Sequence, residues 1–261
     1  AMGAAGCDLN IGCPQRRARE GFYGSWMQED WDLCCAIIAA ARTACPQGFA
    51  VTAKLRVQYC ERGTRPSTER TVEFARRLVA AGADLIALHA RVRGSPEQRR
   101  AGAADLTVVR ALVDAGLGVP ILSNGNVRSR EDVALNLKAT GADGVMCAEE
   151  LLRDPSLFAP EKRSPTALIG EYLDLLRTCD IPREDGSVSG KDGAVTRATP
   201  EGVERYSVGW ANIEVLRCHV KRMLERSGSS GKETLQRNTF RKAATIADVD
   251  RYLRARLRLA E

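Results

Sequence analysis

Five short apolar stretches recur between residues 7 and 147, and longer segments with helical spacing separate them. The expected strands cover residues 7–11, 49–57, 85–89, 119–123 and 144–147. The expected helices between them cover residues 31–44, 67–81, 104–116 and 129–139. Strands that start every ~25–40 residues are typical of repeated βα units around a parallel sheet.

Polar side chains follow the ends of these strands, which is where a (β/α)8 barrel builds its site. Such a barrel has eight strands, whereas the apolar pattern predicts only five. An open five-stranded sheet would leave two unpaired edges, which natural folds avoid. The predicted fold class is therefore α/β, a TIM (β/α)8-type barrel that lacks its first three βα units and is followed by a helical domain.

The pattern changes near Pro165, after which helical spacing dominates. The expected helices of this part cover residues 166–178, 210–226, 233–244 and 246–259. Residues 180–208 are rich in Gly, Asp, Ser and Lys, a composition that predicts a disordered insertion. We therefore predict two domains, a partial barrel over residues 1–163 and a helical domain over residues 164–261.

The positive charge is concentrated in the predicted helical domain. The chain carries a net charge of +6, and residues 201–261 hold 13 Lys and Arg against 8 Asp and Glu. A basic tail fits a polyanionic partner such as a nucleic acid. An Arg-rich helical surface in contact with solvent accounts for the same composition.

Composition also limits the class of protein. No apolar run reaches membrane-spanning length, and residues 1–6 are too short and lack the basic start of a signal peptide. Nine cysteines, an odd number, argue against a fully paired disulfide framework, and with only two histidines no metal site is expected. We expect a monomer in a reducing compartment, the cytoplasm, with the nucleus as the alternative.

Candidate chemistry begins with residues 7–16, Cys-Asp-Leu-Asn-Ile-Gly-Cys-Pro-Gln-Arg. Gly12 and Pro14 end the first strand, so Asn10 and Cys13 lie at its carboxyl end, where a carboxamide and a thiol can face one ligand. The alternative is a buried strand followed by a structural cysteine. Lys54 and His89 likewise stand at strand ends, and their alternatives are a lysine that reaches solvent and a core histidine.

Six stretches, taken together and in this order, resemble the tRNA-dihydrouridine synthase family. They are Asp-Leu-Asn-Ile-Gly-Cys-Pro-Gln (8–15), Gly-Phe-Tyr-Gly (21–24), Ala-Lys-Leu-Arg (53–56), Leu-His-Ala-Arg (88–91), Ser-Asn-Gly-Asn-Val (123–127) and Asp-Gly-Val-Met-Cys-Ala-Glu (143–149). The resemblance covers residues 6–160 well and the remainder more loosely. Gln15 and the pair Ala148 and Glu149 are similar to the eukaryotic type-one branch.

The resemblance implies an enzyme in which FMN, reduced by NADPH, passes a hydride to C6 of a uracil in the tRNA D-loop. Cys13 matches the family's catalytic cysteine, which protonates C5, and Arg91 would meet the substrate or the flavin. The positions implied to bind FMN are Asn10, Lys54, His89, Asn124, Gly125, Asn126, Ala148 and Glu149. The candidate tRNA phosphate contacts in the basic tail are Arg217, Lys221, Arg222, Arg241 and Lys242.

Two other functions stay open at this point. One is a different FMN-dependent barrel oxidoreductase that acts on a small molecule, similar to dihydroorotate dehydrogenase, although the basic tail and the Asn-x-Gly-Cys-Pro motif count against it. The other is a catalytically inactive tRNA-binding fragment, because the absent βα units would include part of the flavin site. If the tail does not hold the RNA, we expect Arg16, Arg17, Arg19 and the 92–104 loop to hold it.

Overall fold

The computed structural model describes residues 4–60, 65–94, 103–178, 194–199, 202–207, 213–227, 240 and 246–258. The chain divides into two compact units, Ala1–Cys147 and Ala148–Glu261. The predicted boundary between residues 163 and 164 therefore falls inside the second unit, because α6 (Glu149–Arg153) groups with the helices that follow it.

The first unit is built on a parallel sheet in the order β1-β2-β4-β5-β6. Its strands are β1 (Gly6–Ile11), β2 (Ala50–Tyr59), β4 (Leu85–Val92), β5 (Ile121–Asn124) and β6 (Gly144–Met146). All five predicted strands are present and pair in parallel, as the sequence predicts. A two-residue strand, β3 (Pro66–Ser67), adds an antiparallel pairing to the end of β2 that the sequence pattern did not predict.

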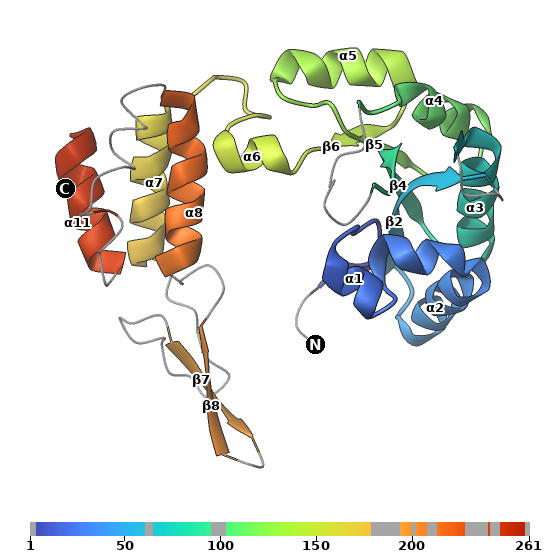
Figure 1. The fold of residues 1–261 in the computed structure, drawn as a ribbon, viewed down its shortest axis with the longest axis horizontal. Coiled ribbons are helices and arrows are strands. Elements are labelled where there is room, and N and C mark those ends of the chain that lie inside the picture. The colour runs from blue at the N-terminus through green and yellow to red at the C-terminus, as the bar shows by residue number, and fades with distance from the viewer. Residues whose placement is uncertain are drawn as a thin grey trace. The chain divides into compact units, whose positions relative to one another are not determined.

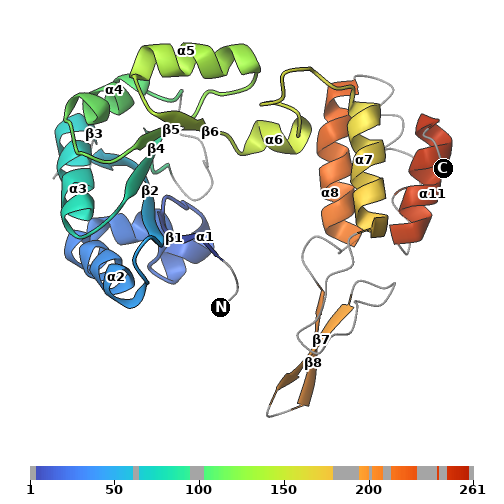
Figure 2. The same cartoon turned by 180° about the vertical axis from the view of Figure 1, so that it is seen from behind.

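Helices follow the strands and lie along one side of the sheet (Figures 1 and 2). They are α2 (Trp31–Ala44), α3 (Thr68–Ala80), α4 (Leu106–Asp114) and α5 (Arg130–Thr140). Ser67 and Ser129 cap α3 and α5 through their hydroxyl oxygens, which accept hydrogen bonds from backbone N–H groups in the first turn. Asp30 and Asp105 cap α2 and α4 with their carboxylates in the same way.

Alternation along the strands separates an apolar face from a polar face. Leu55 pairs with Leu88, and both are completely buried against helix residues such as Ile38, Phe74 and Leu112. Residues one position away, which a strand turns to the opposite face, are mostly polar. The apolar face therefore fixes the register of the sheet, and the polar face is left to carry chemistry.

The segment after β1 contains two short helices that the apolar pattern does not predict. Arg16–Glu20 forms the short helix α1, and a 3-10 helix, η1 (Gly24–Glu29), follows it. A five-residue helix is too short to show a periodic apolar pattern, and its one buried residue is Ala18.

Three of the helices described in the second unit share an apolar core. These are α7 (Pro165–Thr178), α8 (Ile213–Leu224) and α11 (Ile246–Leu257), and the short 3-10 helix η2 (Glu225–Ser227) follows α8. Ile169, Leu216, Val220 and Leu253 are fully buried between them. The predicted helix at 233–244 lies outside the described residues except at Phe240, which packs in this core.

The prediction of a disordered insertion over residues 180–208 is wrong for part of that range. Two antiparallel strands, β7 (Ala194–Thr199) and β8 (Gly202–Ser207), form a two-stranded sheet there. These strands contain the β-branched and aromatic residues that favour strands, such as Val195, Val203 and Tyr206, and the overall polar composition obscured them. Residues 180–193 of the range lie outside the described part of the chain.

Phe74 tests the apolar face. Its ring is fully buried and stacks on Trp31 with centroids 5.0 Å apart, so Phe74→Ala should lower the free energy of unfolding by about 3–5 kcal/mol. Leu135→Ala, at a side chain that is 64% exposed, should change it by less than about 0.5 kcal/mol. Denaturant unfolding of both variants measures the difference, and equal effects would contradict the assignment of the core.

Candidate functional site

The polar face of the sheet gathers the predicted site residues at the carboxyl ends of the strands. Asn10 on β1 pairs in register with Lys54 on β2, and one row further along, Arg56, His89 and Asn124 pair across β2, β4 and β5. These two rows are two residues apart, so their side chains emerge on the same face. The structure thus brings together residues that are up to 114 positions apart in sequence.

The loop that carries Cys13 is held by its main chain. Ser25 donates two hydrogen bonds, from its N–H and its hydroxyl, to the carbonyl oxygen of Cys13, each 2.9 Å long. Gly24 lies against the same residue with φ at +60°, and a Cβ there would come within 2.7 Å of that carbonyl oxygen. A residue other than glycine would therefore displace the loop that positions the half-buried Cys13.

Arg56 is the site residue that the sequence analysis left out of its candidate set. Its side chain is only 4% exposed and reaches two main-chain carbonyls. Nε donates to Gly12 O at 2.7 Å, and Nη1 donates to Val92 O at 3.1 Å. One guanidinium therefore joins the ends of β1 and β4 from its position on β2. The signal in the sequence was its spacing of two residues from Lys54, which puts both cations on one face.

Lys54 lies beside the Cys13 loop. A Cβ placed on Gly12 would be 3.8 Å from Lys54 Nζ and 3.9 Å from Asn10 Oδ1. Burial first, and then the charge of Arg56, lower the pKa of Lys54, while Asp8 opposes the change. Lys54 Nζ has no hydrogen bond or ion pair to any residue that the structure describes. A desolvated cation of this kind is suited to a ligand that carries or develops negative charge.

His89 and Arg91 form a linked pair on β4. Arg91 Nη1 lies 3.0 Å from His89 Nε2, and because a guanidinium can only donate, Nε2 is the acceptor and the ring proton is assigned to Nδ1. Arg91 Nη2 donates to Asn126 Oδ1 at 3.0 Å. The imidazole is thus fixed in one tautomer, with Nε2 as the acceptor and the proton on Nδ1.

The Asn-Gly-Asn sequence after β5 is mainly a scaffold. Asn124 donates its amide to Met146 O at 2.7 Å, and the carboxamide of Asn126 pairs with both the N–H and the C=O of Ala104. Gly125 has φ at +130°, and a Cβ there would lie 2.8 Å from the Ala104 side chain. The two asparagine side chains therefore hold the strand ends.

The remaining predicted residues lie in the second unit. Ala148 precedes α6, and Glu149 begins it and forms an ion pair with Arg153 at 3.2 Å. On α8, Lys221 is exposed, Arg217 is half-buried, and Arg222 contacts Glu225 at 3.5 Å. Arg241 and Lys242 lie outside the described residues. The roles predicted for these seven residues stay predictions.

Two searches of the described residues give negative results. No group of three or more His, Cys, Asp or Glu side chains is arranged to hold a metal ion within the described ranges. No helix in that part of the chain is long and apolar enough to cross a membrane.

A parallel β/α sheet whose strand ends collect a thiol, carboxamides and four basic side chains is the arrangement in which folds of the TIM-barrel type build their sites. The chain belongs to the dihydrouridine synthase family, because the family model described as "Dihydrouridine synthase (Dus)" matches residues 1–186.

Three curated relatives support the family assignment. The tRNA-dihydrouridine(16/17) synthase-like protein of Rattus norvegicus is 40% identical over 181 residues, 67% of this chain and 37% of that protein. The tRNA-dihydrouridine(16/17) synthases of Schizosaccharomyces pombe and Saccharomyces cerevisiae are each 32% identical, over 71% and 66% of this chain and 46% and 40% of those proteins. The chain thus spans less than half the length of these relatives.

One solved structure, a nitroalkane oxidase from Streptomyces ansochromogenes, is 20% identical over 86% of this chain and 49% of that chain. Its TM-score of 0.32 is too low to support a conclusion about fold or chemistry.

Lys54 makes the stability of the fold depend on pH. Because its folded pKa is lowered, the buried charge destabilises the fold at all pH values below that pKa, and this cost disappears as the pH rises to the unfolded value of about 10.4. Lys54→Met should therefore raise the free energy of unfolding near neutral pH, with a gain that shrinks toward pH ~10.4. Denaturant unfolding of both proteins across this pH range measures the gain, and a constant difference would contradict the assignment.

Proposed function

We propose that this chain carries the catalytic cysteine and most of the flavin contacts of a tRNA-dihydrouridine synthase, which uses NADPH to reduce a uridine of the tRNA D-loop to 5,6-dihydrouridine. The observation that carries the proposal is the meeting of Cys13, Lys54 and His89 at adjacent strand ends, with Lys54 Nζ unpaired among the described residues. The names of the relatives, which are tRNA-dihydrouridine synthases that use NAD(P), support the same reaction.

The site fits FMN in its donors and its charge. Bound FMN would supply the hydride for C6 of uracil after taking one from NADPH. Lys54 would stabilise negative charge on the pyrimidine end of the ring, because its ammonium is desolvated and has no hydrogen bond or ion pair among the described residues. His89 would donate from Nδ1, and Asn10 would donate from its amide while its Oδ1 accepts the Gly12 N–H at 3.1 Å. Arg91, which orients His89, would contact the flavin or the substrate.

Cys13 would act as the acid. Hydride addition at C6 leaves negative charge on C5 and O4 of uracil, so a group on the protein must deliver a proton to C5. A thiol carries an S–H proton that it can donate as a general acid. The hydrogen bonds from Ser25 to the Cys13 carbonyl support this role, because they fix the main chain and leave the thiol free to meet the base.

The phosphate of FMN would bind where the last two strands end. Gly125 allows close approach of the backbone to a phosphate. The side-chain amides of Asn124 and Asn126 already donate to main-chain carbonyls, so backbone N–H groups would make the contacts to the phosphate. Ala148 and Glu149 would complete this position. Both residues come directly after β6, and TIM barrels usually bind phosphate in the loops after their last two strands.

The finer architecture is part of the proposal. The parallel sheet would be five strands of a (β/α)8 barrel whose first three βα units lie outside this chain, and the helices of residues 164–261 would form the tRNA-binding domain. As to the target, relatives named for positions 16 and 17 reach 40% identity, whereas those named for positions 20a and 20b reach 29%. We therefore propose a uridine at position 16 or 17.

The first test is Cys13→Ala in the full-length protein. The variant should keep the yellow flavin absorption and the affinity for tRNA, and it should form dihydrouridine about 10²–10⁴ times more slowly, because a positioned acid is lost. Mass spectrometry of unmodified tRNA after reaction with NADPH measures the product and its position. A wild-type protein without flavin would refute the proposed function, and near-normal turnover by the variant would show that Cys13 is structural.

The second test addresses the tail. Lys221→Glu with Arg222→Glu should weaken binding across many RNA sequences and lower the salt dependence, by roughly 0.7–0.9 in the slope of log K against log salt for each lost phosphate contact. Flavin absorption should not change. The control is Arg76→Glu with Arg110→Glu, a matched charge reversal on α3 and α4. Equal affinity and slope in both double variants would mean that the tail does not hold the RNA.

A further inference from the structure

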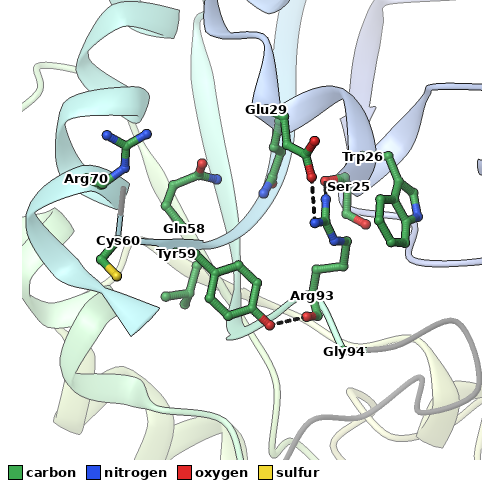
Figure 3. A pocket seen from close by; sticks show the side chains of 11 residues that line it. Ser25, Trp26, Glu29, Gln58, Tyr59, Cys60, Arg70, Arg93 and Gly94 are labelled. Atoms are coloured by element: carbon green, nitrogen blue, oxygen red, sulfur yellow. Dashed lines mark hydrogen bonds and ion pairs between the residues drawn. The ribbon is translucent and has the colours of Figure 1, made fainter. Parts of the chain in front are cut away.

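A pocket lies beside the candidate site, at the same edge of the sheet. It has a volume of about 520 Å³ and is lined by the ends of β2 and β4 and by η1 (Figure 3). Pockets of roughly 300–1,000 Å³ are typical of small-ligand sites. None of the residues assigned above to flavin or to proton transfer lines it.

One wall of this pocket is a guanidinium that lies over an aromatic ring. Arg93 Cζ lies 3.7 Å from the centroid of the Trp26 ring, Nη1 donates to Ser25 O at 2.9 Å, and Nη2 pairs with Glu29 at 2.6 Å. These contacts fix the plane of Arg93, whose side chain is only 17% exposed. A fixed guanidinium plane offers a stacking surface at little entropic cost.

The other sides of the pocket bring an aromatic ring and a second cation. Figure 3 shows the Tyr59 ring between Gln58 and Arg93, with the Tyr59 hydroxyl directed to the backbone of Arg93, to whose carbonyl it donates. Arg70 approaches from the side of α3, with its guanidinium 4.6 Å from the Trp31 ring centroid. Among the described residues that line the pocket, two are arginines and one is a glutamate.

This chemistry suits a nucleotide better than an apolar ligand. RNA-binding proteins hold splayed bases on aromatic rings and on arginine planes, and they hold the attached phosphates with cations. Tyr59 and Arg93 supply the planes, and Arg70 supplies a cation on the opposite side. Glu29 and Gln58 add polar groups that can meet the edge of a base.

The neighbouring surface favours RNA as the source of this nucleotide. Helix α1 presents three arginines at exposed positions, Arg16, Arg17 and Arg19, and the last of these lies 5.3 Å from the Trp26 ring centroid. The next two aromatic side chains, Phe22 and Tyr23, are 47% and 48% exposed. A row of cations with exposed aromatics follows a polynucleotide backbone rather than a single small molecule.

The pocket is also tied to the catalytic loop. Ser25, whose carbonyl holds Arg93, donates both of its hydrogen bonds to the carbonyl of Cys13. We propose that this pocket binds the base of a nucleotide next to the target uridine, so that seating the neighbour positions the uracil beside Cys13. The proposal rests on the proposed function and adds a substrate subsite to it.

The test uses two pairs of variants in the full-length, flavin-loaded protein. Tyr59→Leu removes the ring, whereas Tyr59→Phe removes only the hydroxyl and serves as its control. Arg70→Ala removes the cation that faces the pocket, and Arg76→Ala, on the exposed side of the same helix, is its control. Fluorescence anisotropy gives the Kd for unmodified tRNA, and steady-state kinetics gives KM for tRNA and for NADPH separately.

We expect Tyr59→Leu and Arg70→Ala each to raise the Kd and KM for tRNA about 5- to 100-fold, the range found when a stacking contact to a base is removed. Tyr59→Phe and Arg76→Ala should stay within about 2-fold of the wild-type protein. Flavin content and the KM for NADPH should be the same in all five proteins. Arg70 lies on α3 and not in the sheet, so Arg70→Ala tests the role of the pocket in tRNA binding even if Tyr59→Leu does not fold.

Three results would overturn the proposal. In the first, Arg70→Ala binds tRNA as Arg76→Ala does. In the second, the KM for NADPH rises while the affinity for tRNA stays unchanged, which would assign the pocket to the reductant. In the third, Tyr59→Phe loses as much tRNA affinity as Tyr59→Leu, which would mean that the hydroxyl contact to Arg93 only supports the fold. Each result differs from failure of the proposed function, in which the wild-type protein itself forms no dihydrouridine.

Discussion

The candidate site depends on one buried guanidinium. Arg56 leaves β2 and donates to Gly12 O and Val92 O, so it fixes the Cys13 loop and the end of β4 to the same strand. Removing a cation of this size from water is costly unless its donors are used, and hydrogen bonds from a charged donor are the stronger kind. Its own backbone N–H donates to the buried Gln28 side chain at 2.7 Å, which ties η1 to the same point. Arg56 therefore connects the ends of β1, β2 and β4.

The same strands satisfy two opposing demands. Their apolar face needs Leu55, Leu88 and Phe74 to exclude water, which fixes the register. Their polar face then brings basic side chains together. Burial, and then the charge of Arg56, lowers the pKa of Lys54, while burial, and then the charge of Arg91, lowers the pKa of Arg56. The hydrophobic face supplies the stability that lets the polar face keep unfavourable charge for a bound anion. Sites with this kind of strain are common where a fold has been adapted to bind or react.

The sequence predicted what local chemistry determines. Each predicted strand is present, because short apolar runs between segments of helical spacing specify buried strands. It also predicted that Asn10, Lys54 and His89 meet. The roles of Arg56, Ser25 and the two asparagines could not be predicted, because each depends on which carbonyl of another segment lies nearby. The β7–β8 sheet was missed for a different reason, since average composition hides two short strands.

The anchors around residues 95–102 have a consequence for how this protein can vary. On one side, Val92 and Arg93 are bonded to Arg56, Ser25 and Tyr59, and on the other, the carboxamide of Asn126 holds both polar groups of the Ala104 backbone. Because the ends are held independently of what joins them, the connection can change in length without moving His89 or Cys13. Doubling such a connection costs only about 0.6 kcal/mol in closure entropy. A change in the length of this connection is therefore compatible with an unchanged geometry of the candidate site.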